Sequence, residues 1–171
     1  MRLVEAEQCK ANATDLFAKW KPIIESSIPD SRVEHIGSTA IAGALTKGDV
    51  DLYVEVPASA HADAVAAIQA FGFSVKHDTH RDSELCMLEK PDQDGLALQV
   101  VARGSKYEFF LLFRDALNGD AELVQRYNQL KQDAIGSTPE HYRAQKTSFI
   151  ESVLQGPSAH ADKKSRANWR A

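Results

Sequence analysis

The sequence predicts an α+β fold, with a mixed β-sheet covered by helices on one face and a helical C-terminal part. The hydrophobic period changes along the chain in the order helix, two strands, helix, further strands and then helices. Two of the strands, 85–89 and 96–102, flank the turn-forming segment 91–95, which indicates a hairpin and therefore antiparallel pairing within the sheet. Helices on one face of such a sheet leave an open cleft on the other.

The N-terminal elements follow from spacing and from helix-breaking residues. A segment from about 5 to 27 carries apolar residues at helical spacing and is predicted to be one helix, kinked or split at Pro22. Residues 32–36 are predicted to form the first strand, 37–48 a turn, and 49–56 the second strand.

The later elements are marked by turn residues. We expect a helix over 59–71, a short strand at 73–75, and the hairpin. From about 106 on the pattern is helical, with interruptions at 118–119 and 136–139, and the last helix ends near 155. The sequence thus predicts a single domain over 1–157, followed by a polar, flexible tail over 158–171.

Composition limits the function classes. The chain has 171 residues, 43% of them hydrophobic and 26% charged, as in ordinary water-soluble domains. Its net charge of −4 argues mildly against a nucleic-acid-binding surface. There are two cysteines, and we find neither a signal segment behind Met1 nor an apolar run that could span a bilayer. We therefore expect a cytoplasmic protein with no membrane partner.

The most informative segment couples a strand end to two carboxylates. The first strand ends at Gly37-Ser38, and Asp49 lies eleven residues beyond Ser38. Side chains alternate along a strand, so Asp49 and Asp51 share one face, opposite four buried aliphatic residues. Two adjacent carboxylates suit Mg²⁺ or Mn²⁺, which completes its shell with water and substrate phosphates. The alternative is a solvent-facing strand edge on which acids happen to alternate.

Two further features of the sequence could contact phosphate. Gly37 would allow close backbone approach, and Ser38 could open a short helix whose N–H groups favour an anion; the alternative is a simple tight turn. Lys146 lies on the apolar stripe of the last helix, where its ammonium either reaches the rim or binds a phosphate in the cleft.

Beyond these patterns, several motifs in the sequence resemble those of the GrpB family. The resemblance covers roughly residues 5 to 155 and is carried by the segment 34–41 (Glu-His-Ile-Gly-Ser-Thr-Ala-Ile), Gly43, Lys47, the 113–115 Phe-Arg-Asp triplet and the later residues Tyr127, Leu130, Lys131, Tyr142, Lys146, Phe149 and Ile150. It implies a nucleotidyltransferase fold. It also implies Mg²⁺-dependent transfer of a nucleoside monophosphate from a nucleoside triphosphate to an unknown acceptor, which could be a protein, a tRNA or a small molecule.

In that picture Asp49 and Asp51 hold the metal and form the catalytic pair, while Gly37, Ser38 and Lys146 bind the triphosphate. The sequence departs from the family at Gln99, Ala42 and Gly48. Active nucleotidyltransferases commonly carry a third acid on a later strand, and the related proteins usually show histidine at the position of Gln99. Glutamine is no base and a poor Mg²⁺ ligand, so the alternative is a catalytically degenerate nucleotide-binding or protein-interaction module of the same fold.

Three other groups of residues favour structural roles. His35 is predicted to pack or hydrogen-bond within its strand, and Arg114 to form an ion pair with Asp115 or a neighbouring acid. The pair His77 and His80 has zinc-like spacing but no third ligand at a defined distance, so a charged loop is the preferred interpretation.

Overall fold

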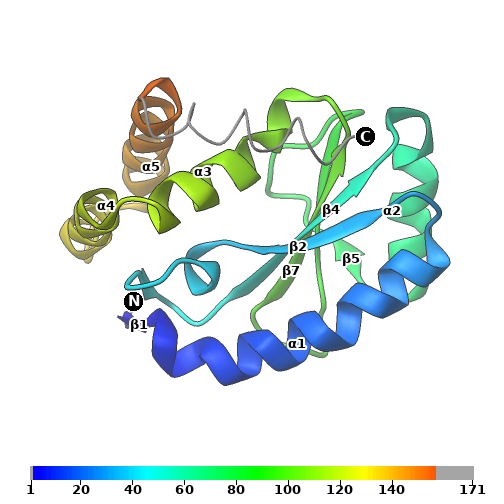
Figure 1. Ribbon diagram of the computed structural model, residues 1–171, viewed down its shortest axis with the longest axis horizontal. Coiled ribbons are helices and arrows are strands. Elements are labelled where there is room, and N and C mark those ends of the chain that lie inside the picture. Colours follow the sequence, from blue (N-terminus) through cyan, green and yellow to red (C-terminus); the bar gives the residue numbers. More distant parts are fainter. Residues whose placement is uncertain (1, 157–171) are drawn as a thin grey trace.

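The computed structural model describes residues 2–156 and contains a five-stranded sheet (Figure 1). The predicted tail over 158–171 lies outside the described residues. The strand order is β2-β4-β7-β6-β5, with β4 parallel to β7 and every other neighbouring pair antiparallel. The predicted mixed sheet is thereby confirmed. The strand bounds are β2 Arg32–Ile36, β4 Val50–Val56, β5 Ser74–Val75, β6 Leu85–Glu89 and β7 Leu96–Ala102.

Two helices cover one face of the sheet, as the sequence predicted. These are α1 (Ala6–Ser27) and α2 (His61–Ala70), seen below and beside the strands in Figure 1. Their apolar residues pack on the aliphatic face of β4 and β7, where Leu52, Val54 and Leu98 are fully buried. Burial of this apolar surface is the main favourable contribution to folding.

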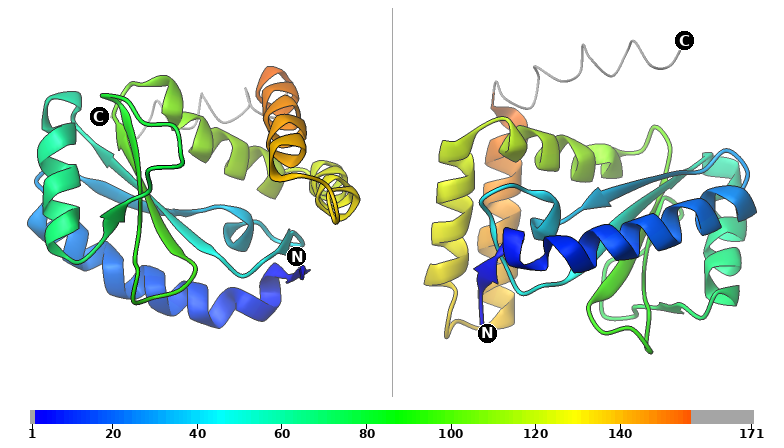
Figure 2. Two further views of the ribbon diagram at one scale, coloured as in Figure 1. Left: turned by 180° about the vertical axis from the view of Figure 1, so that it is seen from behind. Right: turned by 60° about the horizontal axis from the view of Figure 1, so that its bottom comes forward.

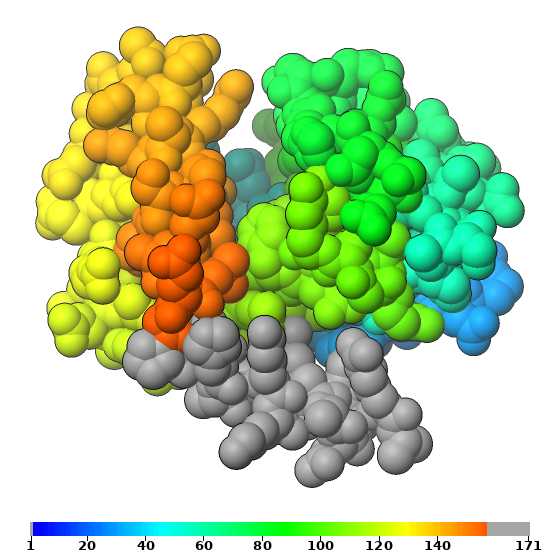
Figure 3. Space-filling view, turned by 90° about the horizontal axis from the view of Figure 1, so that it is seen from above, coloured from blue at the N-terminus to red at the C-terminus, as the bar shows by residue number. Residues whose placement is uncertain are grey.

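The helical C-terminal part stands beside the sheet. It consists of α3 (Phe109–Asn118), α4 (Ala121–Asp133) and α5 (Pro139–Gln155), and Figure 2 shows α4 and α5 side by side. The three helices meet around Phe113, Tyr127 and Phe149, with the Tyr127 and Phe149 rings stacked at 5.5 Å between centroids. In Figure 3 the surface is hollowed between α4 and α5 (yellow and orange) and the green part of the chain.

The second face of the sheet is partly covered as well. Tyr53 and Val101 are fully buried there against Tyr107, from the 3₁₀ turn η3 (Lys106–Glu108), and Leu111 of α3. The rest of this face borders a cavity. The open cleft that the sequence predicted therefore occupies only part of the face.

The structure differs from the predicted elements near the N-terminus. A two-stranded sheet, β1 (Val4–Glu5) with β3 (Leu45–Thr46), was not predicted, because two-residue strands show no periodicity. The first helix begins at Ala6 rather than at residue 5, and it is continuous through Pro22, so a split there was wrong. The predicted helix over 59–71 is a 3₁₀ turn, η2 (Ala58–Ala60), followed by α2. Asp49 precedes β4 instead of beginning it.

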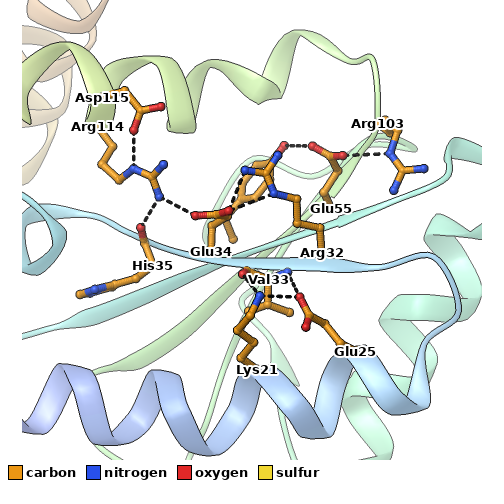
Figure 4. A network of polar contacts seen from close by, with 11 residues as sticks. Lys21, Glu25, Arg32, Val33, Glu34, His35, Glu55, Arg103, Arg114 and Asp115 are labelled. Atoms are coloured by element: carbon orange, nitrogen blue, oxygen red, sulfur yellow. Dashed lines mark hydrogen bonds and ion pairs between the residues drawn. The ribbon is translucent and has the colours of Figure 1, made fainter. Parts of the chain in front are cut away.

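An ion-pair network ties α3 to β2 across the sheet edge (Figure 4). The Arg114 guanidinium donates to Glu34 at 3.0 Å, to the His35 carbonyl at 2.8 Å and to Asp115 at 2.7 Å. Arg32 contacts the other oxygen of Glu34 at 2.6 Å. The predicted ion pairing of Arg114 is confirmed, and it fixes the end of β2 relative to the helical part.

Within residues 2–156, every helix is too short or too polar to cross a bilayer.

Candidate functional site

A cavity of about 320 Å³ lies where the sheet meets the helical part. It brings together all five residues that the sequence singled out, although they come from the end of β2, the start of β4 and α5. These are Gly37, Ser38, Asp49, Asp51 and Lys146. The cavity also takes in residues not assigned to the site from the sequence, among them Lys131 and Tyr127 of α4.

Glycine backbone packs directly against each of the two carboxylates. A Cβ at Gly37 would lie 2.5 Å from Asp51 Oδ2, closer than real Cβ contacts come. Gly37 also has φ 76° and ψ −175°, a conformation that is essentially restricted to glycine. A Cβ at Gly95, with φ 75°, would lie 3.3 Å from Asp49 Oδ1. The sequence predicted that Gly37 lets a ligand come close to the backbone. In the structure the Asp51 side chain lies at this position.

Replacing Gly37 with alanine should lower the free energy of unfolding by roughly 1–3 kcal/mol for the backbone alone, with a further loss from the contact with Asp51. The control is Gly104→Ala, where φ is 82° but nothing lies within 4 Å of the added Cβ. Urea denaturation of both variants measures the difference. Equal losses in the two variants would show that Asp51 does not press on Gly37.

Burial sets the proton affinity of Asp51. Removal from water raises the pKa of its carboxyl to about 6, the nearby Asp49 charge adds to the rise, and Lys146 opposes it. Asp49, in contrast, is exposed to solvent. Without a cation, the ionised carboxylate of Asp51 therefore costs free energy near neutral pH. A bound divalent ion would remove this electrostatic cost.

A buried lysine supports the serine of the motif. Lys131 is 3% exposed, and its ammonium donates to Ser38 Oγ at 2.7 Å and to the Leu45 carbonyl and lies 3.8 Å from the centroid of the Tyr127 ring. Because Ser38 Oγ accepts from Lys131, its own hydroxyl hydrogen is free to point into the cavity. Burial, and then the charge of Lys146, lower the pKa of Lys131 to about 7.

Lys146 reaches the cavity from α5. The pKa of its ammonium is raised by interaction with the Tyr127 phenol, and further by Tyr142 and Asp51, against the opposing effect of burial. It therefore stays charged at neutral pH and lies close enough to Asp51 for their charges to interact. A role in phosphate binding remains a prediction.

Two asparagines hold the loop between the motif turn and β4. Asn118 exchanges hydrogen bonds with Ala42 N–H (3.0 Å) and the Ala40 carbonyl (3.0 Å). Asn128 does the same with Leu45 N–H (2.7 Å) and the Gly43 carbonyl (2.8 Å). These contacts join residues more than 75 positions apart, so sequence spacing gave no sign of them.

Gln99 also lines the cavity, on the strand next to β4. It is 8% exposed and pairs in register with Tyr53, while Asp51 pairs with Ala97. No group of three or more potential metal ligands occurs among the described residues. The absence of a third acid from this part of the chain agrees with the departure seen in the sequence.

His35 and His80 have structural partners. The His35 ring stacks on Phe17 at 6.1 Å and its Nε2 lies 2.9 Å from Thr39 Oγ1, as expected of a packed strand residue. His80 lies 3.0 Å from an Asp82 oxygen and 2.7 Å from the Tyr107 hydroxyl. The loop that carries His80 is thus tied to Tyr107 of η3.

Comparison with known proteins settles the family. The family model described as "GrpB protein" matches residues 4–156. The chain belongs to the GrpB family. A UPF0157 protein of Vibrio cholerae serotype O1 is 44% identical over 154 residues, covering 90% of this chain and 82% of its own. Another UPF0157 protein, from Deinococcus radiodurans, is 32% identical over 80% of this chain and 72% of its own.

The fold is shared with a solved GrpB structure. GrpB from Enterococcus faecalis superposes with a TM-score of 0.66 and 22% identity, over 96% of this chain and 99% of the other. The α+β fold assignment and the resemblance read from the sequence are therefore confirmed.

In this GrpB protein, the carboxylate pair suits a divalent ion that enters together with a phosphate-bearing substrate better than an ion that the protein would hold alone. Mg²⁺ is commonly held by one or two carboxylates plus water and substrate phosphates. The described residues offer the two acids Asp49 and Asp51 and no cluster of three ligands. The raised pKa of Asp51 shows an electrostatic cost that such an ion would relieve.

Proposed function

We propose that this GrpB protein binds a nucleoside triphosphate with Mg²⁺ or Mn²⁺ and transfers its nucleoside monophosphate to an acceptor. The observation that carries the proposal is one cavity that combines two carboxylates with Ser38 and the ammonium groups of Lys131 and Lys146. Carboxylates for a metal and cations for phosphate are the parts that phosphoryl and nucleotidyl transfer require.

In this proposal each residue has a distinct task. Ser38 donates its hydroxyl and backbone N–H to a phosphate, and Lys131 and Lys146 neutralise the β- and γ-phosphates. Asp49 and Asp51 would hold the metal, which supplies charge neutralisation at the phosphate oxygens when bound. An acceptor hydroxyl oxygen forms a bond to the α-phosphorus, the bond from that phosphorus to the bridging oxygen breaks, and pyrophosphate leaves. The acceptor proton passes to water, since Gln99 cannot take it.

One observation favours a second candidate. Gln99 occupies the cavity wall where a third acid would assist transfer, and the described residues supply no substitute cluster. A protein that binds the metal–nucleotide complex without catalysis would show the same nucleotide binding but no release of pyrophosphate. Release of pyrophosphate is therefore the measurement that separates an enzyme from a binding module.

Binding is tested by calorimetry with Mg²⁺ and ATP at pH 8. We expect binding to take up protons, because a phosphate at Ser38 stabilises the charged form of Lys131, whose pKa is about 7 in the free protein. The measured heat should then vary with the ionisation enthalpy of the buffer, and affinity should fall as the pH rises above 7. Asp51 is already ionised at pH 8 and contributes little.

The control is Lys131→Met, which should bind with a heat that no longer depends on the buffer. A wild-type protein that shows no heat and no rise in melting temperature with millimolar Mg²⁺ and ATP would overturn the proposal, because a ligand of the native state must stabilise it.

A further inference from the structure

A second cavity, of about 380 Å³, shares the carboxylate pair with the first. It is lined by both aspartates and Met87, which also line the first cavity, and by the β6–β7 hairpin and its surroundings. Apart from Met87 and Gln99, the first cavity is lined by the start of β4, by β2 and the segment after it, and by residues from near the N-terminus and from the helical part, whereas the second is lined mainly by the β6–β7 hairpin. Asp49 and Asp51 thus form the boundary between two cavities.

The two cavities differ in charge. Four basic side chains line the first: Lys47, Arg114, Lys131 and Lys146. The second has two, Lys76 and Lys90, against two acids besides the shared pair, Glu89 and Asp94. A polyphosphate therefore fits the first cavity better than the second.

Both lysines of the second cavity already have a carboxylate partner. Lys76 donates to Glu89 at 2.6 Å, and Lys90 donates to Asp92 at 2.5 Å. Asp94 is exposed, lines this cavity, and makes no hydrogen bond or ion pair within the described part of the chain. If a divalent ion neutralises the shared aspartates, Asp94 is the charged side chain in the lining of this cavity that has no partner among the described residues.

We propose that the second cavity binds the acceptor, and that the acceptor is a small hydroxylated amine rather than a nucleic acid. The inference rests on the proposed nucleotidyl transfer. In that reaction the attacking and leaving oxygens lie roughly in line on opposite sides of phosphorus. With the pyrophosphate portion held by Lys131 and Lys146, the acceptor hydroxyl has to approach the α-phosphorus from the side of the β6–β7 hairpin.

Charge and size decide the class of acceptor. A chain of phosphates would meet Asp94 and two lysines that already pair with carboxylates, so the second cavity has no excess of positive charge to replace its counterions. An ammonium group would instead be attracted to Asp94, and a neighbouring hydroxyl would reach the carboxylate pair. A volume of about 380 Å³ suits a small molecule, since small-ligand pockets span roughly 300–1,000 Å³.

The test uses three probes on the full chain saturated with Mg²⁺ and α,β-methylene ATP, which cannot release pyrophosphate. These are 1,3-diamino-2-propanol, its uncharged counterpart glycerol, and an oligouridylate. We expect calorimetry to show saturable binding of the diamine, at least several-fold tighter than that of glycerol and with no binding of the oligouridylate. Asp94→Asn should weaken diamine binding about two- to five-fold, as for an exposed ion pair, and leave binding of the nucleotide analogue unchanged.

The matched control is Asp15→Asn, which removes the same charge from an exposed position of α1 that lines neither cavity. Binding of the oligouridylate, equal binding of glycerol and the diamine, or equal effects of the two substitutions would each overturn the inference. If the analogue binds but the diamine does not, the acceptor inference alone fails. If the analogue itself does not bind, the proposed function fails and the acceptor inference fails with it.

Discussion

Replacing Asp51 with asparagine is expected to have two opposite effects on stability. Without metal at pH 8, the variant should be more stable than the wild type, by on the order of 2–3 kcal/mol for a pKa raised from 3.8 to about 6. With Mg²⁺ and ATP, the order should reverse, because the variant loses a metal ligand and most of the ligand-induced rise in melting temperature.

The sign of the first effect follows from proton binding. A carboxyl whose pKa is raised by folding costs stability when it is ionised, so the cost is absent below about pH 4 and complete above about pH 6. The gain from Asp51→Asn should therefore disappear in acid. Melting curves in EDTA at pH 4 and pH 8 test it, with Asp15→Asn as the exposed control. A variant less stable than wild type at pH 8 would mean that Asp51 is held by interactions beyond its burial.

Replacing Gln99 with glutamate should create or raise metal-dependent pyrophosphate release. The residue lines the same cavity as the carboxylate pair, and a carboxylate there adds both a metal ligand and a possible general base. General-base assistance is typically worth about 10²–10⁴-fold in rate. The measurement is release of pyrophosphate from ATP in the presence of Mg²⁺.

The control for this substitution is Gln129→Glu, which places the same new charge in α4 outside the cavity. If the wild type already releases pyrophosphate at an ordinary rate and Gln99→Glu slows it, then Gln99 contacts substrate and the base lies elsewhere. In that case the missing acid would not explain weak activity.

Local patterns gave most of the fold. The bounds of β2, β6 and β7 agree with the predicted 32–36, 85–89 and 96–102, because short apolar segments next to turn-forming residues mark each strand in the sequence itself. The sequence also placed Asp49 and Asp51 on one face, and in the structure both line the same cavity. Periodicity carries such information wherever one face of an element is buried.

The missed parts of the site depend on contacts between distant segments. Lys131 lies 93 positions from Ser38, and nothing in the spacing of α4 shows that its ammonium points at the motif turn. The contacts of Asn118 and Asn128 with the loop are of the same kind. Gly95 looked like an ordinary turn residue, and only the folded chain shows that its backbone faces Asp49.

The contact of Gly37 with Asp51 links two positions in the evolution of this chain. The glycine has no room for a side chain while the carboxylate lies against it. A lineage that lost the acid would remove the steric contact at the glycine but not the requirement of its backbone conformation, whereas a lineage that gained a side chain at the glycine would displace the acid. The position of the acid therefore depends on the glycine, and retention of both in a sequence is a stronger sign of a working site than the glycine alone.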